Sequence, residues 1–140
     1  MRHRRATVKL GRTTAHRTAL LASLVNNLIE CKRIRTTVQK AKLARSLADR
    51  MVTLAKDGSL HARRRAIAAL RRKDRVAQLF EEIAPACAAR SGGYTRVIKL
   101  GRRPSDGSEM AFLEWVDVAP VVVRRKKKED EKPAEPTKSE

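Results

Sequence analysis

Residues 92–118 read GGYTRVIKLGRRPSDGSEMAFLEWVDV, and this stretch does most to decide the fold. Its paired glycines break the preceding chain, because glycine adopts backbone conformations that are closed to other residues. Aromatic, β-branched and aliphatic residues then fill positions 94–100 and 110–118, which predicts two strands. The proline, aspartate and glycine of residues 101–108 predict a hairpin loop between them. Hydrophobic alternation is imperfect in both strands, so we expect part of each sheet face to be covered by helices or by a partner.

Helical spacing of apolar residues dominates the chain before this hairpin. It predicts a first helix from about Ala15 to Cys31 and a second from about Val38 to Lys56, which the following Asp-Gly pair ends. Between these helices, the segment KRIRTT at residues 32–37 predicts a short strand, because its isoleucine is followed by two β-branched threonines.

Two further helices are predicted before the hairpin. Ser59 is expected to cap the third helix, and Asp74 is expected to cap a fourth that extends to about Ile83. A short helical stretch follows around Pro85. The order helix, strand, three helices, two strands predicts an α+β fold in which a small mixed or antiparallel sheet packs on helices.

Composition indicates the kind of partner. The 140 residues carry 33 Lys and Arg against 15 Asp and Glu, a formal net charge of +18, and 41% hydrophobic residues are enough for one modest core. So large an excess of positive charge favours a protein that works against a dense polyanion, with nucleic acid as the first candidate. A membrane surface is a weaker candidate, because no stretch approaches the roughly 20 apolar residues that span a bilayer.

Charge is distributed unevenly along the chain. No acidic residue precedes Glu30, and the first residues are rich in arginine and poor in apolar surface. We therefore expect a basic, mobile N-terminal arm over residues 1–13, one α+β domain over 14–120 and a disordered charged tail over 121–140. The five consecutive cations of the tail either touch RNA or, more commonly for such runs, are simply solvated.

No constellation of catalytic or metal-ligating residues appears. Cys31 and Cys87 stand far apart without a second ligand at metal spacing, so we expect neither a disulfide nor a metal site. The histidines are expected to be surface hydrogen-bonding groups. The sequence therefore predicts that the protein is not an enzyme and has no cofactor, no metal and no small-molecule substrate. A hydrolase or nuclease that uses His61 or Cys31 is the remote alternative.

The starts of the first two predicted helices carry the most specific binding signal. Acidic residues normally populate the first helical turn, where the helix dipole favours negative charge. Here His16 and Arg17 follow Thr14, and Lys40 and Lys42 follow Thr37. Free backbone N–H groups, threonine hydroxyls and cations together predict phosphate sites, although solubility alone also favours such cations.

Other basic and aromatic residues are less specific. Arg64 and Arg71 fall on one stripe of the third helix, and such a stripe is commonly a solvated face, with RNA contact as the alternative. At 3% aromatic content, only Tyr94 offers a ring for stacking, since Phe80, Phe112 and Trp115 are expected in the core. Recognition is therefore expected to use phosphates, sugars and RNA shape.

Several ungapped blocks resemble a known family. MRHRR, KLGRTTAHR, RIRTT leading into VQKAK, LAKDG, GGYTRVIKLG and MAFLEWVD resemble the bacterial large-subunit ribosomal protein L17 family over nearly all of residues 1–118. The resemblance implies an α+β fold that binds large-subunit, 23S-type ribosomal RNA near the polypeptide exit side. It also implies a cytoplasmic ribosome, neighbouring ribosomal proteins such as L32, and no enzymatic activity. Gly11 stands where the family pattern has asparagine, so an amide contact there is not carried over.

From the charge distribution and the resemblance together we predict a ribosomal protein. Its N-terminal arm is expected to become ordered when RNA phosphates neutralise its positive charge. The alternative is a free nucleoid-type DNA-binding protein, for which the same charge is suitable. The residues predicted to bind RNA are Arg2, His3, Arg4, Arg5, Lys9, Arg12, Thr13, Thr14, His16, Arg17, Arg33, Arg35, Thr36, Thr37, Lys40, Lys42, Arg64, Arg71, Tyr94 and Arg96.

Overall fold

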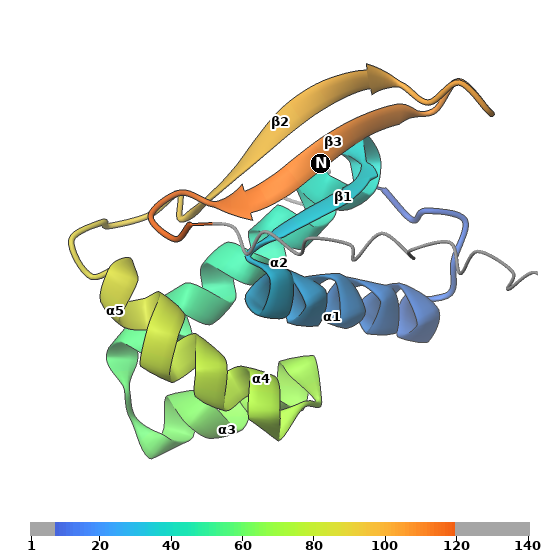
Figure 1. Cartoon of the computed structure of the whole chain (residues 1–140). Helices are drawn as coiled ribbons and strands as arrows, with labels where there is room; N and C mark the ends of the chain where they lie inside the picture. The colour runs from blue at the N-terminus through green and yellow to red at the C-terminus, as the bar shows by residue number, and fades with distance from the viewer. Residues whose placement is uncertain (1–7, 120–140) are drawn as a thin grey trace, which may run out of the picture.

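The computed structural model describes residues 8–119, in which a three-stranded sheet lies over a group of helices (Figure 1). The elements are α1 (Thr14–Cys31), β1 (Arg33–Thr37), α2 (Val38–Asp57), α3 (Leu60–Leu70), α4 (Lys73–Gln78), the π-helical η1 (Leu79–Ile83), α5 (Ala84–Ala86), β2 (Thr95–Arg102) and β3 (Glu109–Trp115). The predicted α+β class is confirmed. Residues 1–7 of the expected arm and the expected tail at 121–140 lie outside the described residues.

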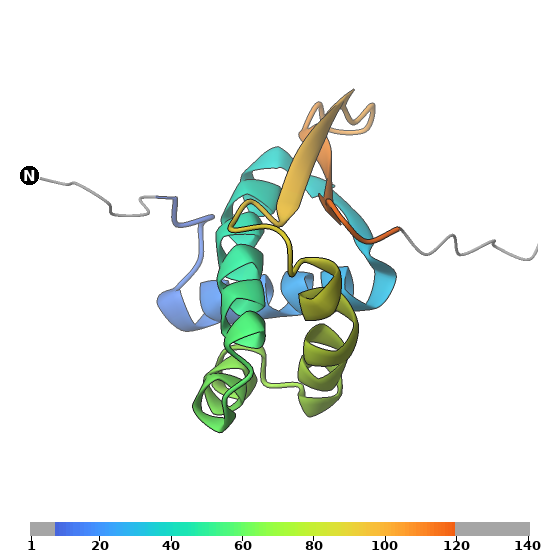
Figure 2. The same cartoon turned by 90° about the vertical axis from the view of Figure 1, so that its left-hand side faces the viewer.

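The sheet is antiparallel throughout, with the order β1-β3-β2. The last strand in the chain is thus the central one, and it pairs with strands on both sides. Arg33 of β1 lies opposite Glu114 of β3, and Arg96 of β2 lies opposite the same glutamate. A β-bulge shifts the β2–β3 register between Lys99 and Gly101. All helices of the described residues lie on one side of the sheet, as Figures 1 and 2 show, and no helix of residues 8–119 lies on the other face, which we call the open face.

The core lies between the inner face of the sheet and helices α1 and α2. Leu113 and Trp115 of β3 pack there with Leu28 and Ile29 of α1 and Met51 of α2, all of them buried. The Trp115 Nε1–H donates to the backbone carbonyl of Leu28 over 3.0 Å. This buried bond ties the central strand to the C-terminal turn of α1, so the sheet and α1 are held in one fixed relation.

Ser59 caps α3 as predicted, with its hydroxyl accepting from the Ala62 N–H over 3.1 Å. Three other predicted boundaries need correction: the start of α4 and the bounds of the two hairpin strands. Asp74, however, does not cap α4: Arg72 holds the cap position, and the Asp74 carboxylate accepts from the Arg72 guanidinium instead. The two hairpin strands are Thr95–Arg102 and Glu109–Trp115, because the ladder ends at the Thr95–Trp115 pair and residues 116–118 have no strand opposite them within the described chain.

Candidate nucleic-acid interface

The N-terminal ends of α1 and α2 lie at the same end of the molecule. α1 leads into β1, which runs back along the sheet, and α2 starts where β1 stops (Figure 1). Residues 8–13, which precede α1, also lie at this end (Figure 1). We call this region the basic end; its helix-start residues are Thr13, Thr14, His16, Arg17, Thr36, Thr37, Lys40 and Lys42.

Both helices start without a side-chain cap. Thr13 and Thr37 hold the cap positions of α1 and α2 in extended conformation, yet neither hydroxyl bonds to its own helix, and neither first turn contains an acidic residue. Thr13 thus occupies the N-cap position of α1 without the side-chain hydrogen bond that a threonine there commonly makes. The first N–H groups of an uncapped helix have no partner within the helix, so both starts present donors to an external anion.

The cations of the basic end are free of ion pairs. Among residues 8–119, no acidic side chain lies within ion-pair distance of Arg17, Lys40 or Lys42. Most of the ion pairs form elsewhere, as in Arg75–Glu30 at 2.7 Å and Lys32–Glu82 at 2.5 Å, where the end of α1 meets α4 and η1. Positive charge at the basic end is thus left for a partner outside the described chain.

Two cations that the sequence analysis did not single out extend the basic end. The hairpin places Lys99 and Arg102 beside Val38, the first residue of α2, where they line a hollow of about 250 Å³. Neither forms an ion pair within the part of the chain that the structure describes. In the sequence they belong to the basic run RVIKLGRR at residues 96–103. Their place beside α2 depends on the strand register, which the sequence alone does not give.

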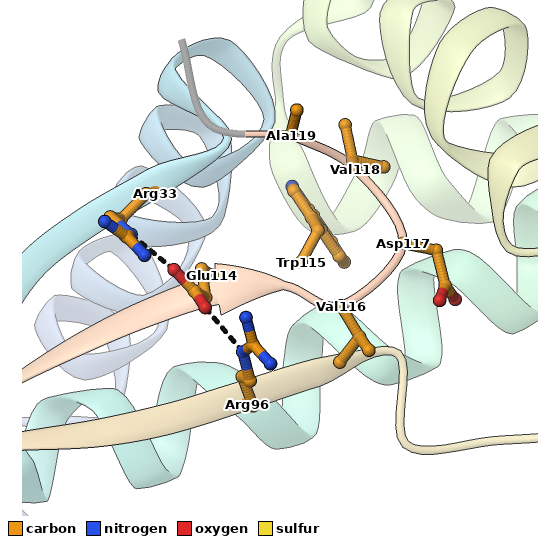
Figure 3. A pocket seen from close by; sticks show the side chains of 8 residues that line it. All are labelled: Arg33, Arg96, Glu114, Trp115, Val116, Asp117, Val118 and Ala119. Atoms are coloured by element: carbon orange, nitrogen blue, oxygen red, sulfur yellow. Dashed lines mark hydrogen bonds and ion pairs between the residues drawn. The ribbon is translucent and has the colours of Figure 1, made fainter. Parts of the chain in front are cut away.

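Glu114 holds two of the predicted cations together on the open face of the sheet (Figure 3). Its side chain is only 3% exposed and accepts from the Nε–H of Arg33 and, over 2.5 Å, from the Nε–H of Arg96. Burial acts to raise the pKa of Glu114, but the two hydrogen bonds outweigh it and the pKa lies below its ordinary value. The carboxylate is therefore charged at neutral pH.

The remaining predicted residues are scattered or hidden. Tyr94 does not offer its ring for stacking, because it is 3% exposed and packed in the core, so that expectation is wrong. Phe112 and Phe80 are only half-buried, and each ring carries a stacked arginine in place of core neighbours on that side. Arg64 and Arg71 are exposed at α3 (Figure 1), on the helical side, and do not join the basic end.

Residues 8–119 contain no group of three or more histidine, cysteine, aspartate or glutamate side chains placed to hold a metal ion. No helix in the described part of the chain is both long and apolar enough to cross a bilayer.

A family model described as ribosomal protein L17 matches residues 20–116. The chain belongs to the ribosomal protein L17 family. The resemblance that its motifs indicated is thus confirmed. A relative from Methylacidiphilum infernorum, named large ribosomal subunit protein bL17, is 51% identical over 117 residues, which cover 84% of this chain and 89% of the relative. Proteins of the same name from Finegoldia magna and Clostridioides difficile are 57% and 52% identical, covering 78% and 77% of this chain and 83% and 96% of theirs.

The turn that leads into α1 explains why glycine suits position 11, where the resemblance led us to expect asparagine. Leu10 and Gly11 both have left-handed backbone, with φ of 56° and 63°. Glycine adopts this conformation freely and asparagine is among the few other residues that tolerate it, so both satisfy the same turn. Arg12 folds back here, with its Nη1–H donating to the Leu10 carbonyl over 2.8 Å, which leaves the exposed Lys9 as the freer cation of this L17 segment.

Replacing Glu114 by glutamine is expected to lower the free energy of unfolding by about 2 kcal/mol near neutral pH. Breaking a buried ion pair costs about 3–5 kcal/mol, and the partial exposure of Arg33 and Arg96 reduces that cost. Because folding lowers the pKa of Glu114, its contribution is complete above the unfolded pKa and is lost as the pH falls through the folded one. Urea unfolding, followed by Trp115 fluorescence at about pH 7 and about pH 3, measures both effects.

The matched control is Glu109→Gln on the same strand, an exposed residue without an ion pair in residues 8–119, which should change stability by less than about 0.5 kcal/mol. A Glu114→Gln deficit that is equally large at both pH values would contradict the assignment of this energy to the charged carboxylate.

Proposed function

We propose that this chain is a structural constituent of the large ribosomal subunit, in cytoplasmic ribosomes, and that it binds 23S-type ribosomal RNA through phosphate and shape contacts. Membership of the L17 family and the names of its relatives support the assembly to which it belongs. The observation that supports the RNA contact is the basic end, where two helix starts without side-chain caps meet cations that form no ion pairs within residues 8–119. No catalytic step forms part of this proposal.

The basic end suits a phosphate backbone for a physical reason. Each helix start offers backbone N–H donors and a threonine hydroxyl, and the lysine or arginine of the first turns supplies the charge. These contacts fix position and orientation without reading bases. The exposed Arg35 and the hairpin cations Lys99 and Arg102 extend the same positive surface along the sheet.

The proposal also includes the domain organisation expected from the sequence. A basic arm over residues 1–13 follows the RNA, the domain over 14–120 fixes its position, and the charged tail over 121–140 is a separate segment. Neighbouring large-subunit proteins such as L32 complete the environment that the family resemblance implies.

A free nucleoid-type DNA-binding protein is the competing function, and a competition experiment separates the two. Folded large-subunit ribosomal RNA should displace duplex DNA of equal total charge even at a concentration about tenfold lower than that of the DNA. We expect this because only the ribosomal role requires a specific RNA shape. Equal affinity for the two polyanions at physiological salt would favour the DNA-compacting function and overturn the proposal.

Replacing Arg2, Arg4 and Arg5 together by alanine is expected to make RNA binding less dependent on salt. If about eight phosphates are contacted, log K falls with log salt at a slope of roughly −6 to −7, and losing three contacts reduces that slope by about two to three units. Filter binding over a salt series measures the slope. The thermal unfolding midpoint of the free protein should stay nearly unchanged, and an unchanged slope would remove the arm from the interface.

A further inference from the structure

The open face of the sheet presents two adjacent rows of side chains. In an antiparallel sheet, residues directly opposite one another share a face, as do residues two apart on one strand. The first row is therefore Arg33, Glu114 and Arg96, and the second is Arg35, Phe112 and Ile98. All helices of the described chain pack on the opposite face (Figures 1 and 2), so no helix among residues 8–119 covers these rows.

Glu114 fixes the orientation of the two arginines of the first row. Both arginines donate to it through Nε, and within the described residues no hydrogen bond involves their terminal Nη atoms. A guanidinium held by its Nε keeps its outer N–H donors in a fixed plane, which suits the bidentate binding of a phosphate. The row lines an open hollow of about 310 Å³ together with residues 115–119 (Figure 3).

The second row adds apolar and stacking surface. The guanidinium of Arg33 lies 4.9 Å from the centre of the Phe112 ring, so the two rows are in contact. Beside them, Ile98 is 38% exposed, and Arg35 is exposed without an ion pair in residues 8–119. Aromatic rings and guanidinium planes are the surfaces on which proteins stack unpaired bases.

We propose that this open face binds unpaired nucleotides of an RNA, with Arg33 and Arg96 on a phosphate and the bases against Phe112 and Ile98. The inference rests on the proposed function and adds a base-contacting surface to the phosphate contacts of the basic end. Charge favours RNA over a protein partner: among residues 8–119, three arginines stand on the face, Glu114 is held between two of them, and Asp117 of the adjoining hollow is paired with Arg90. The face also continues into the basic end, because Arg35 precedes Thr36 and Thr37 on β1.

The test compares two RNAs with equal numbers of phosphates, a hairpin with a long unpaired loop and a fully paired duplex. The intact chain should bind the hairpin about tenfold more tightly, a difference that the stacking of one or two bases accounts for. The double variant Arg35→Gln/Phe112→Leu should lose this preference. Its matched control is Arg50→Gln/Phe80→Leu, which removes one exposed charge on α2 and a second arginine-stacked ring, that of Phe80 beside Arg63, and should keep the preference.

The outcomes are distinguishable. The preference should survive in Lys40→Gln/Lys42→Gln, which weakens both RNAs alike by removing basic-end contacts. A preference that survives in the Arg35→Gln/Phe112→Leu variant, or that is absent in the intact chain, overturns the inference and leaves the proposed function standing. If the open-face variant instead binds both RNAs normally but fails to enter reconstituted large subunits, the face docks a protein and the inference is also wrong. An intact chain that binds neither RNA overturns the proposed function itself.

Discussion

Replacing Arg17, Lys40 and Lys42 together by glutamine should weaken binding to large-subunit ribosomal RNA about a hundredfold at physiological salt. With each lost phosphate contact one counterion fewer is released on binding, which is worth about a factor of five at about 0.15 M salt, and three such losses give about two orders of magnitude. The three side chains form no ion pairs within residues 8–119, so the change should leave the fold intact. Equilibrium binding at two salt concentrations measures the loss and the flatter salt slope.

The control for this triple variant removes the same charge elsewhere. Arg50, Arg65 and Lys73 are exposed on α2, α3 and α4 and also lack ion pairs in the described chain. Changing them to glutamine should reduce affinity less than about threefold, through the long-range field alone. Equal losses in the two triple variants would show that net charge alone determines binding, with no particular role for the basic end.

Replacing Trp115 by alanine should cost about 4 kcal/mol of stability, a large share of the 5–15 kcal/mol typical of a domain. The side chain is 1% exposed, fills the space between β3 and α1, and donates its indole N–H to the Leu28 carbonyl. Since it is the only tryptophan, urea unfolding of the variant is followed by circular dichroism rather than fluorescence.

Trp115→Phe separates the two contributions. It keeps most of the apolar volume and loses the hydrogen bond, and the Leu28 carbonyl still accepts from the Lys32 N–H over 2.9 Å. We expect a cost of about 2 kcal/mol, from the bond and a small cavity. If alanine and phenylalanine cost the same, then packing by the ring does not hold the sheet on α1.

The helices and strands were predictable because their signals are local. The apolar spacing of α1 and α2, the Ser59 cap and the hairpin residues each depend on neighbours a few positions away. The Asp74 cap failed because a competing local partner, Arg72, takes the carboxylate. Strand ends were less predictable because they depend on where the partner strands stop.

The candidate site likewise has features that local sequence predicts and features that depend on the fold. The basic first turns of α1 and α2 are readable from sequence, whereas the missing side-chain caps at Thr13 and Thr37 are not. Both helix starts lie at one end because β1 is short and runs back along the sheet. The Arg33–Glu114–Arg96 cluster was not readable, because its members come from three strands and meet only through the register of the central one. Tyr94 was misjudged because its neighbours in sequence are polar while those in space are the core.

A high-resolution map of the large ribosomal subunit that contains this chain would show directly whether the basic end binds RNA. We expect the hydroxyl of Thr37 and the ammonium groups of Lys40 and Lys42 to lie within about 3 Å of RNA phosphate oxygens. A map in which the starts of α1 and α2 face solvent, with RNA packed instead against the ion-paired side around Glu30 and Glu82, would contradict this expectation.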